Sequence, residues 1–90
     1  LGGGAAGKGF PERYTLRRGR GALRGNGEGA YTVAVFGQAD RPAFDRTDEM
    51  ADLLWGIASK NGVNGLRGLR MVAAGEQTGA IMNIFYTDSV

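Results

Sequence analysis

The residues best suited to chemistry are the arginines near the start of the chain. They are spaced by glycines, with Tyr14 next to the first of them, and comprise Arg13, Arg17, Arg18, Arg20 and Arg24. Arginine offers forked donors that fit phosphate groups and a planar face that stacks on bases, and glycine lets the backbone follow a nucleic-acid strand. The segment is therefore a candidate nucleic-acid-binding site. The alternative is a solvated strand edge, where charges discourage pairing with other chains.

A second phosphate-binding pattern, G-x-x-x-x-G-K, spans Gly2 to Lys8. In a phosphate-binding loop, a helix follows this pattern, and a Ser or Thr after the lysine holds Mg²⁺. Here Gly9 follows the lysine and Pro11 comes soon after, so neither condition is met. We interpret residues 1–11 as a flexible glycine-rich tail rather than as a nucleotide site.

Five acidic residues cluster where the clearest helix of the chain is expected to begin: Asp40, Asp45, Asp48, Glu49 and Asp52. Their spacing does not match a calcium-binding loop, and two arginines interrupt them. Acidic side chains near a helix start stabilise the positive end of the helix dipole, so we interpret the cluster as capping residues and a solvated face. A carboxylate pair for general acid–base catalysis stays open as an alternative.

The chain contains no cysteine and no histidine. This composition excludes disulfides, thiolate or imidazole metal sites, and Ser-His-Asp or Cys-His catalysis within one chain. We therefore expect a protein without a metal, a cofactor or a catalytic site. A small enzyme that uses Asp, Glu, Tyr or Lys groups is the last alternative.

Charge is divided unevenly along the chain. Residues 1–30 carry six basic and two acidic groups, whereas residues 31–90 carry five basic and seven acidic groups. A length of 90 residues suits one domain. We expect the flexible tail, 1–11, to precede a single α+β domain, 12–90. No stretch is long and apolar enough to cross a membrane and no signal sequence is visible, so we expect a cytoplasmic protein that does not bind membranes.

Hydrophobic periodicity predicts the elements of this domain. Alternating residues predict strands, which we place at 12–18, 30–37, 66–74 and 80–87. Asn26-Gly27 predicts a hairpin turn between residues 21–25 and 30–36. Apolar residues at helical spacing predict a helix over 47–60 that turns one stripe to the core: Met50, Leu53, Leu54, Ile57 and Ala58. The fold class is therefore α+β, a small antiparallel or mixed sheet of four to five strands with one helix (47–60) packed on one face.

Both faces of this sheet are expected to be apolar, because the strands read as nearly continuous apolar runs. One helix covers one face only, so a second copy of the chain is expected to cover the other. We therefore predict a homo-oligomer, with a dimer favoured. Aromatic residues are the candidate contacts with a protein partner: Trp55, Tyr31, Phe36 and Tyr86.

The function that the sequence favours is a small non-enzymatic binding module. It is expected to self-associate and to engage a protein partner, as an adaptor, a subunit or an inhibitor. The alternative is a nucleic-acid-binding protein that uses the basic arginine- and glycine-rich segment.

Overall fold

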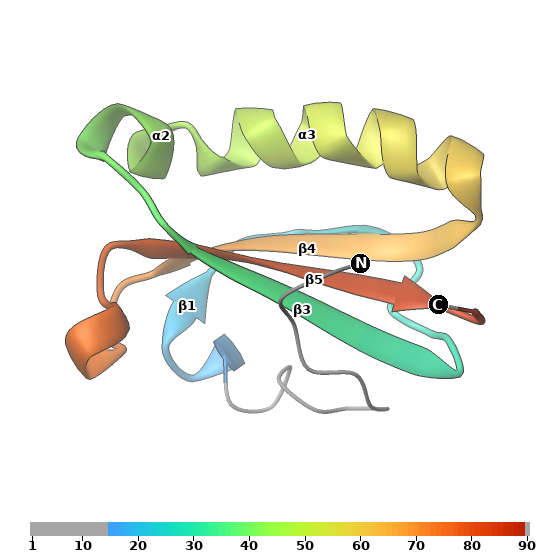
Figure 1. Cartoon of the computed structure of the whole chain (residues 1–90), viewed down its shortest axis with the longest axis horizontal. Coiled ribbons are helices and arrows are strands. Elements are labelled where there is room, and N and C mark those ends of the chain that lie inside the picture. Colours follow the sequence, from blue (N-terminus) through green and yellow to red (C-terminus); the bar gives the residue numbers. More distant parts are fainter. Residues whose placement is uncertain (1–14, 90) are drawn as a thin grey trace.

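The computed structural model describes residues 15–89 of the chain. The predicted flexible tail (1–11), the candidate residue Arg13 and the first three residues of the predicted strand 12–18 lie outside the described residues. The rest of that strand prediction is wrong, because Thr15 and Leu16 are helical and Arg17 and Arg18 form a turn. The elements, in chain order, are β1 (Gly19–Arg20), β2 (Leu23–Gly25), β3 (Tyr31–Gln38), α2 (Arg41–Asp45), α3 (Thr47–Ala58), η1 (Ser59–Asn61), β4 (Val63–Met71), η2 (Gly75–Gln77) and β5 (Ala80–Thr87) (Figure 1).

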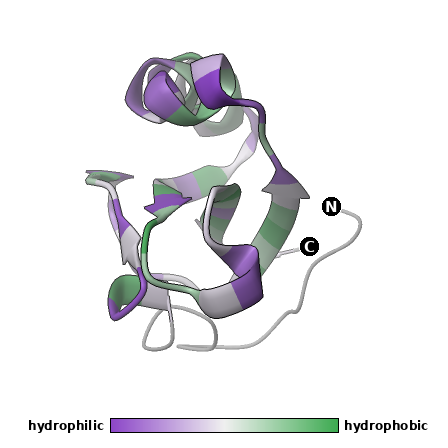
Figure 2. Ribbon diagram, turned by 90° about the vertical axis from the view of Figure 1, so that its left-hand side faces the viewer, coloured by the Kyte–Doolittle hydropathy of each residue, from purple (hydrophilic) through white to green (hydrophobic). Residues whose placement is uncertain are grey.

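In the described part of the chain, the strands form one antiparallel sheet of five strands in the order β1-β4-β5-β3, with β2 also paired to β4. Strands β1 and β2 pair with β4 in the same register, so they are two pieces of one edge strand. Helix α3 lies along one face of this sheet (Figures 1 and 2). The predicted fold class, α+β with one main helix packed on a small sheet, is confirmed.

The main helix ends where the sequence predicted. After α3, the 3₁₀ turn η1 continues to Asn61, and Gly62 adopts a left-handed backbone conformation with a φ of 84°. Glycine tolerates this conformation because it has no Cβ. The short helix α2 was not expected. Its N-terminal cap is Asp40, whose carboxylate accepts a hydrogen bond from the Ala43 amide at 2.9 Å.

The predicted hairpin at Asn26-Gly27 is wrong. Strand β2 pairs with β4 and not with β3. A tight hairpin turn of this sequence needs a positive φ at Asn26, but all positive-φ residues in the described part of the chain are glycines. The Asn26 amide instead donates to the carbonyl of Asn64, at 2.9 Å, which extends the contact between β2 and β4.

The face of the sheet opposite α3 is closed within a single chain. Its core residues are Ala34, Leu69, Met71, Ala80, Met82, Ile84 and Tyr86, all of them buried. This face is therefore covered in the single chain and does not need a second copy to bury it.

Helix α3 packs on β4 through small residues. A Cβ placed on Gly68 would lie 2.7 Å from the Cβ of Ala51, a distance that real Cβ atoms do not reach. Glycine at this position therefore lets the helix come close to the strand. The buried residues of α3 are Thr47, Ala51 and Ala58, and the core beneath the helix is formed by Val33, Leu66 and Phe85 together with Ala58.

The predicted orientation of α3 is wrong by about a quarter turn, at 100° per residue. The stripe expected in the core is largely exposed: 47% of Met50, 73% of Leu53 and 64% of Ile57 is accessible to solvent. Of the other two residues of this stripe, Leu54 is half-buried and Ala58 is buried. A close approach to Gly68 requires a small residue on the side of α3 nearest β4. The larger side chains of the helix therefore lie away from this contact.

None of the helices between residues 15 and 89 is long and apolar enough to cross a membrane.

Candidate functional site

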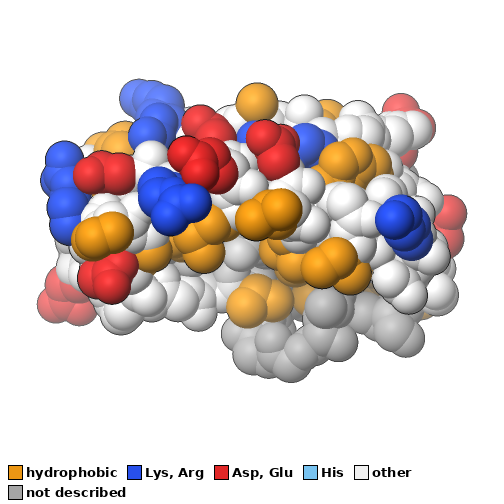
Figure 3. Space-filling view, turned by 90° about the horizontal axis from the view of Figure 1, so that it is seen from above, with side chains coloured by type: hydrophobic (Ala, Val, Ile, Leu, Met, Phe, Trp, Pro, Cys, Tyr) orange, Lys and Arg blue, Asp and Glu red, His pale blue; other side chains and the backbone are white. Residues whose placement is uncertain are grey.

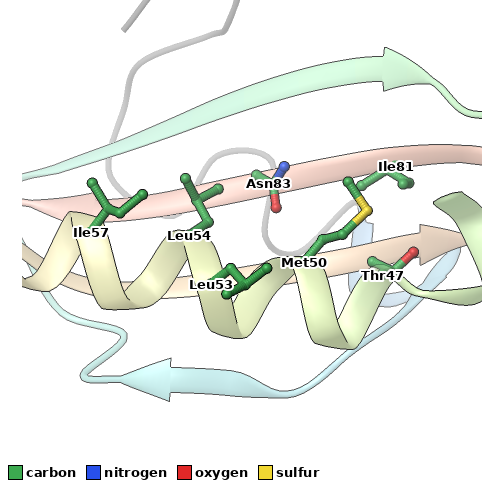
Figure 4. Close-up of a pocket in the computed structure, with 7 residues that line it drawn as sticks. All are labelled: Thr47, Met50, Leu53, Leu54, Ile57, Ile81 and Asn83. Atoms are coloured by element: carbon green, nitrogen blue, oxygen red, sulfur yellow. The ribbon is translucent and has the colours of Figure 1, made fainter.

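An apolar groove runs beside α3, on the side of the helix that faces β5 (Figure 4). We call it the α3 groove, and its volume is about 350 Å³. The residues that line it are Thr47, Met50, Leu53, Leu54 and Ile57 from the helix and Ile81 and Asn83 from the strand. Among the residues that the structure describes, no charged side chain lines this groove, so its chemistry suits an apolar partner surface.

Two polar side chains lie in the α3 groove. The Thr47 hydroxyl donates to the carbonyl of Phe44 at 2.6 Å, so its one proton is used within the protein. The amide of Asn83 has no hydrogen-bond partner among the described residues and is half-buried in the floor of the groove. Asn83 can therefore offer a donor and an acceptor to a group that enters the groove.

The groove continues toward the C-terminal end of α3. A second hollow, of about 440 Å³, shares Leu54 and Ile57 with the first and extends to Val63 and Phe85. Seen from above the helix, hydrophobic side chains gather along one flank of the molecule (Figure 3). The apolar surface therefore extends along the length of α3.

The groove exists because α3 lies off the centre of the sheet. The helix is drawn to β4 by the Ala51–Gly68 contact, while β5 and β3 form the other half of the sheet. A helix is about 10 Å wide, whereas neighbouring strands are about 4.8 Å apart, so one helix covers about two strands. The sheet half formed by β5 and β3 is left partly uncovered on this side.

The opposite flank of α3 is polar and tied to the edge strand. The Arg24 guanidinium of β2 lies 2.7 Å from a carboxylate oxygen of Asp52 and 3.7 Å from one of Asp48. Only 14% of the Arg24 side chain is exposed. Arg24 therefore anchors β2 to α3, and its guanidinium is already engaged by two carboxylates of the helix.

The acidic cluster serves the structure. Besides Asp40, which caps α2, and the two acids that hold Arg24, Asp45 pairs with Arg41 and Glu49 pairs with Arg46, both at 3.0 Å. Among the described residues, no group of three or more acidic side chains is arranged to hold a metal ion. The geometry thus supports the interpretation as capping residues and a solvated face.

The other described arginines of the basic segment lie in different elements from Arg24. Arg17 and Arg18 lie in a turn, and the Arg18 carbonyl accepts hydrogen bonds from the amides of Val72 and Ala73. Arg20 lies opposite Arg70 in the ladder between β1 and β4. Sequence reasoning did not identify Arg70, because its neighbour comes from a strand that is distant in the sequence.

The aromatic residues proposed as partner contacts do not lie together. Tyr86 is buried in the core, with its hydroxyl 3.5 Å from Arg67 Nε, and Phe36 packs against the same core. Trp55 is half-buried against Gly25, and Tyr31 is exposed on β3. None of the four lines the α3 groove, whose exposed residues the sequence analysis had assigned to the core.

Comparisons of the chain with family models, with curated proteins and with solved structures found no match.

Proposed function

We propose that this protein is a small non-enzymatic interaction module that forms a two-fold dimer, in which each copy places its α3 in the α3 groove of the other. The observation that carries the proposal is the exposure of Met50, Leu53 and Ile57 along the groove. Soluble proteins rarely leave a continuous apolar surface of this kind in contact with water unless it binds something.

The occupant that fits the groove is an amphipathic helix with an exposed apolar stripe, lying over the uncovered half of the sheet. Such a helix buries residues at i, i+3 or i+4, and i+7. Helix α3 itself displays this stripe, with Met50, Leu53 and Ile57 at that spacing. A surface that supplies both the groove and the helix is self-complementary, as a two-fold interface requires.

Charge also favours two antiparallel copies of α3. Glu49 lies near the N-terminal end of the helix and Lys60 just beyond its C-terminal end, and both are exposed. At 100° per residue, the two project from the same side of the helix as Leu53. A two-fold axis perpendicular to the helix therefore brings Glu49 of each copy near Lys60 of the other.

The size of the interface is feasible for a chain of this size. A standard interface buries about 800 Å² on each partner. The accessible surface of this chain is 5310 Å², and the flank of α3 with the adjoining half of the sheet extends over the full length of a twelve-residue helix. The role of the dimer as an adaptor, a subunit or an inhibitor of another protein remains part of the proposal.

Light scattering on the wild-type chain and two variants tests the dimer. Leu53→Glu puts a charge in the proposed interface, and we expect it to convert a dimer into a folded monomer. Val72→Glu is the matched control, because Val72 is a partly exposed apolar residue that does not line the groove, and we expect it to remain dimeric. A wild type that stays monomeric at high micromolar concentration contradicts the proposal and leaves the groove to a different protein.

A charge exchange tests the antiparallel arrangement. Lys60→Glu should weaken the dimer by about threefold to tenfold, since exposed ion pairs are worth about 0.2–1 kcal/mol each. Adding Glu49→Lys should restore the wild-type dissociation constant. If the double variant is weaker than Lys60→Glu alone, the helices do not meet in this orientation.

A further inference from the structure

Two arginines lie directly opposite each other on the side of the sheet that carries α3. Arg20 of β1 and Arg70 of β4 are partners in the antiparallel ladder, so their side chains project from the same face. That face is the one of Leu66, which precedes Arg70 by four residues on β4 and belongs to the core beneath α3. Like charges directly opposite each other destabilise a strand pair, so this arrangement requires an explanation.

Neither guanidinium is neutralised by the described part of the chain. No carboxylate there forms an ion pair with Arg20 or Arg70. Arg20 donates one hydrogen bond, from Nη1 to the carbonyl of Gly19 at 3.0 Å. The Nε atom of Arg70 is buried and has no hydrogen-bond partner.

Arg24, which lies four residues beyond Arg20 in β2 on the same edge, is held differently. It projects from the same face, opposite Leu66, but two acids of α3 neutralise it. The edge strand therefore carries one arginine that is satisfied within the protein and another that faces a second positive charge. A buried N–H without an acceptor costs free energy, and such a group is often explained by a bound ion.

We propose that Arg20 and Arg70 together bind a phosphate group. Arginines paired across a ladder on one face can present several N–H donors to one oxyanion, and a phosphate has enough acceptor oxygens and enough charge to engage both at once. The bound phosphate screens the repulsion between the two arginines. This site goes beyond the proposed dimer and does not depend on it.

The arginine signals in nitrogen-15 NMR spectra of the full chain test the site. Inorganic phosphate is added at constant ionic strength, and sodium chloride is the reference titration. We expect saturable shifts of the Nε–H signals of Arg20 and Arg70 with phosphate and none with chloride. Shifts that are linear in phosphate concentration, or that match those with chloride, overturn the proposal.

Variants of the two arginines distinguish a specific phosphate site from nonspecific attraction of phosphate by positive charge. Arg20→Gln and Arg70→Gln should each abolish saturable binding, as followed by amide signals near β1 and β4. Arg20→Lys, which keeps the charge but loses the fork, should weaken binding by at least about tenfold. The control is Arg41→Gln, because Arg41 is an exposed arginine paired with Asp45, and it should bind phosphate as the wild type does. Equal binding by the wild type and both glutamine variants overturns the site.

The same titration identifies the source of the phosphate group. A nucleoside monophosphate and a short single-stranded oligonucleotide are added in parallel with inorganic phosphate. If the oligonucleotide binds more tightly, loses affinity steeply with salt and depends on Arg20 and Arg70, the site holds a nucleic-acid phosphodiester. If the monophosphate binds at least as tightly as the oligonucleotide, the site takes a small phosphorylated ligand. Either result requires that both glutamine variants lose binding.

Discussion

On the face of the sheet opposite α3, the large side chains of Leu69, Met71 and Ile84 are fully buried within one chain. On the face beneath α3, leucine and isoleucine side chains of the helix are more than half exposed. The two faces use the same residue types, so hydrophobicity alone does not decide burial. The difference arises because a close contact at Gly68 fixes the helix over one half of the sheet and leaves the other half uncovered.

The largest expected loss of stability comes from a substitution on the sheet face opposite α3. Leu69→Ala should lower the free energy of unfolding by about 2–5 kcal/mol, because it removes a fully buried side chain and leaves a cavity. Leu53→Ala is the same change on the open side and should cost within about 0.5 kcal/mol, as measured under conditions in which the protein is monomeric. Chemical denaturation measures both, and equal losses would mean that the two faces do not differ as the structure describes.

An intermediate effect is expected where the helix meets the strand. Gly68→Ala should cost about 1–3 kcal/mol, because the new methyl group overlaps Ala51 and pushes α3 away from β4. Gly56→Ala is the control, since a Cβ there meets nothing within 4 Å and replaces a glycine inside a helix. That control should be stabilising by about 0.5–1 kcal/mol. If Gly68→Ala is neutral in thermal unfolding, the contact does not set the position of the helix.

The smallest expected effect concerns the polar flank of α3. Arg24→Ala should cost about 1–2 kcal/mol, because it removes a mostly buried arginine that bonds two acids of the helix. Arg41→Ala removes an arginine whose side chain is 81% exposed and should cost within about 0.5 kcal/mol. Urea unfolding curves of the two variants and the wild type measure both losses of stability. A loss at Arg24 no larger than at Arg41 would show that β2 is not anchored to the helix by these ion pairs.

Local patterns were sufficient to predict most elements. The strands predicted at 30–37 and 80–87 correspond to β3 and β5, and the helix predicted at 47–60 corresponds to α3 with its 3₁₀ extension. The strand predicted at 66–74 begins earlier and ends earlier, at Val63 and Met71. Its first residues, Val63-Asn64-Gly65, contain an irregularity in the ladder and two residue types that are poor strand formers. Its apolar continuation, at Val72 and Ala73, turns away to bond the carbonyl of Arg18.

The candidate sites depend on contacts between distant segments, which local patterns do not contain. The periodicity of α3 indicates which of its residues share a stripe. The side of the helix that approaches the sheet depends on Gly68, which lies on β4 and is distant in the sequence. Thr47, Ala51 and Ala58 form the buried side, and their small size was the available signal. The proximity of Arg20 and Arg70 follows only from the register of β1 on β4.

The pairing of the first edge strand with β4 also bears on how the chain acquires its structure. Strands β4 and β5 are joined by a short connection around η2, so their pairing closes a small loop. Between β2 and β4 lie β3, α2 and α3, so the edge pairing closes a much larger loop and costs more chain entropy. Synthesis proceeds from the N-terminus, so Gly19 to Gly25 are made before their partner strand. The arginines of β1 and β2 therefore have no partner strand to pair with until β4 has been made.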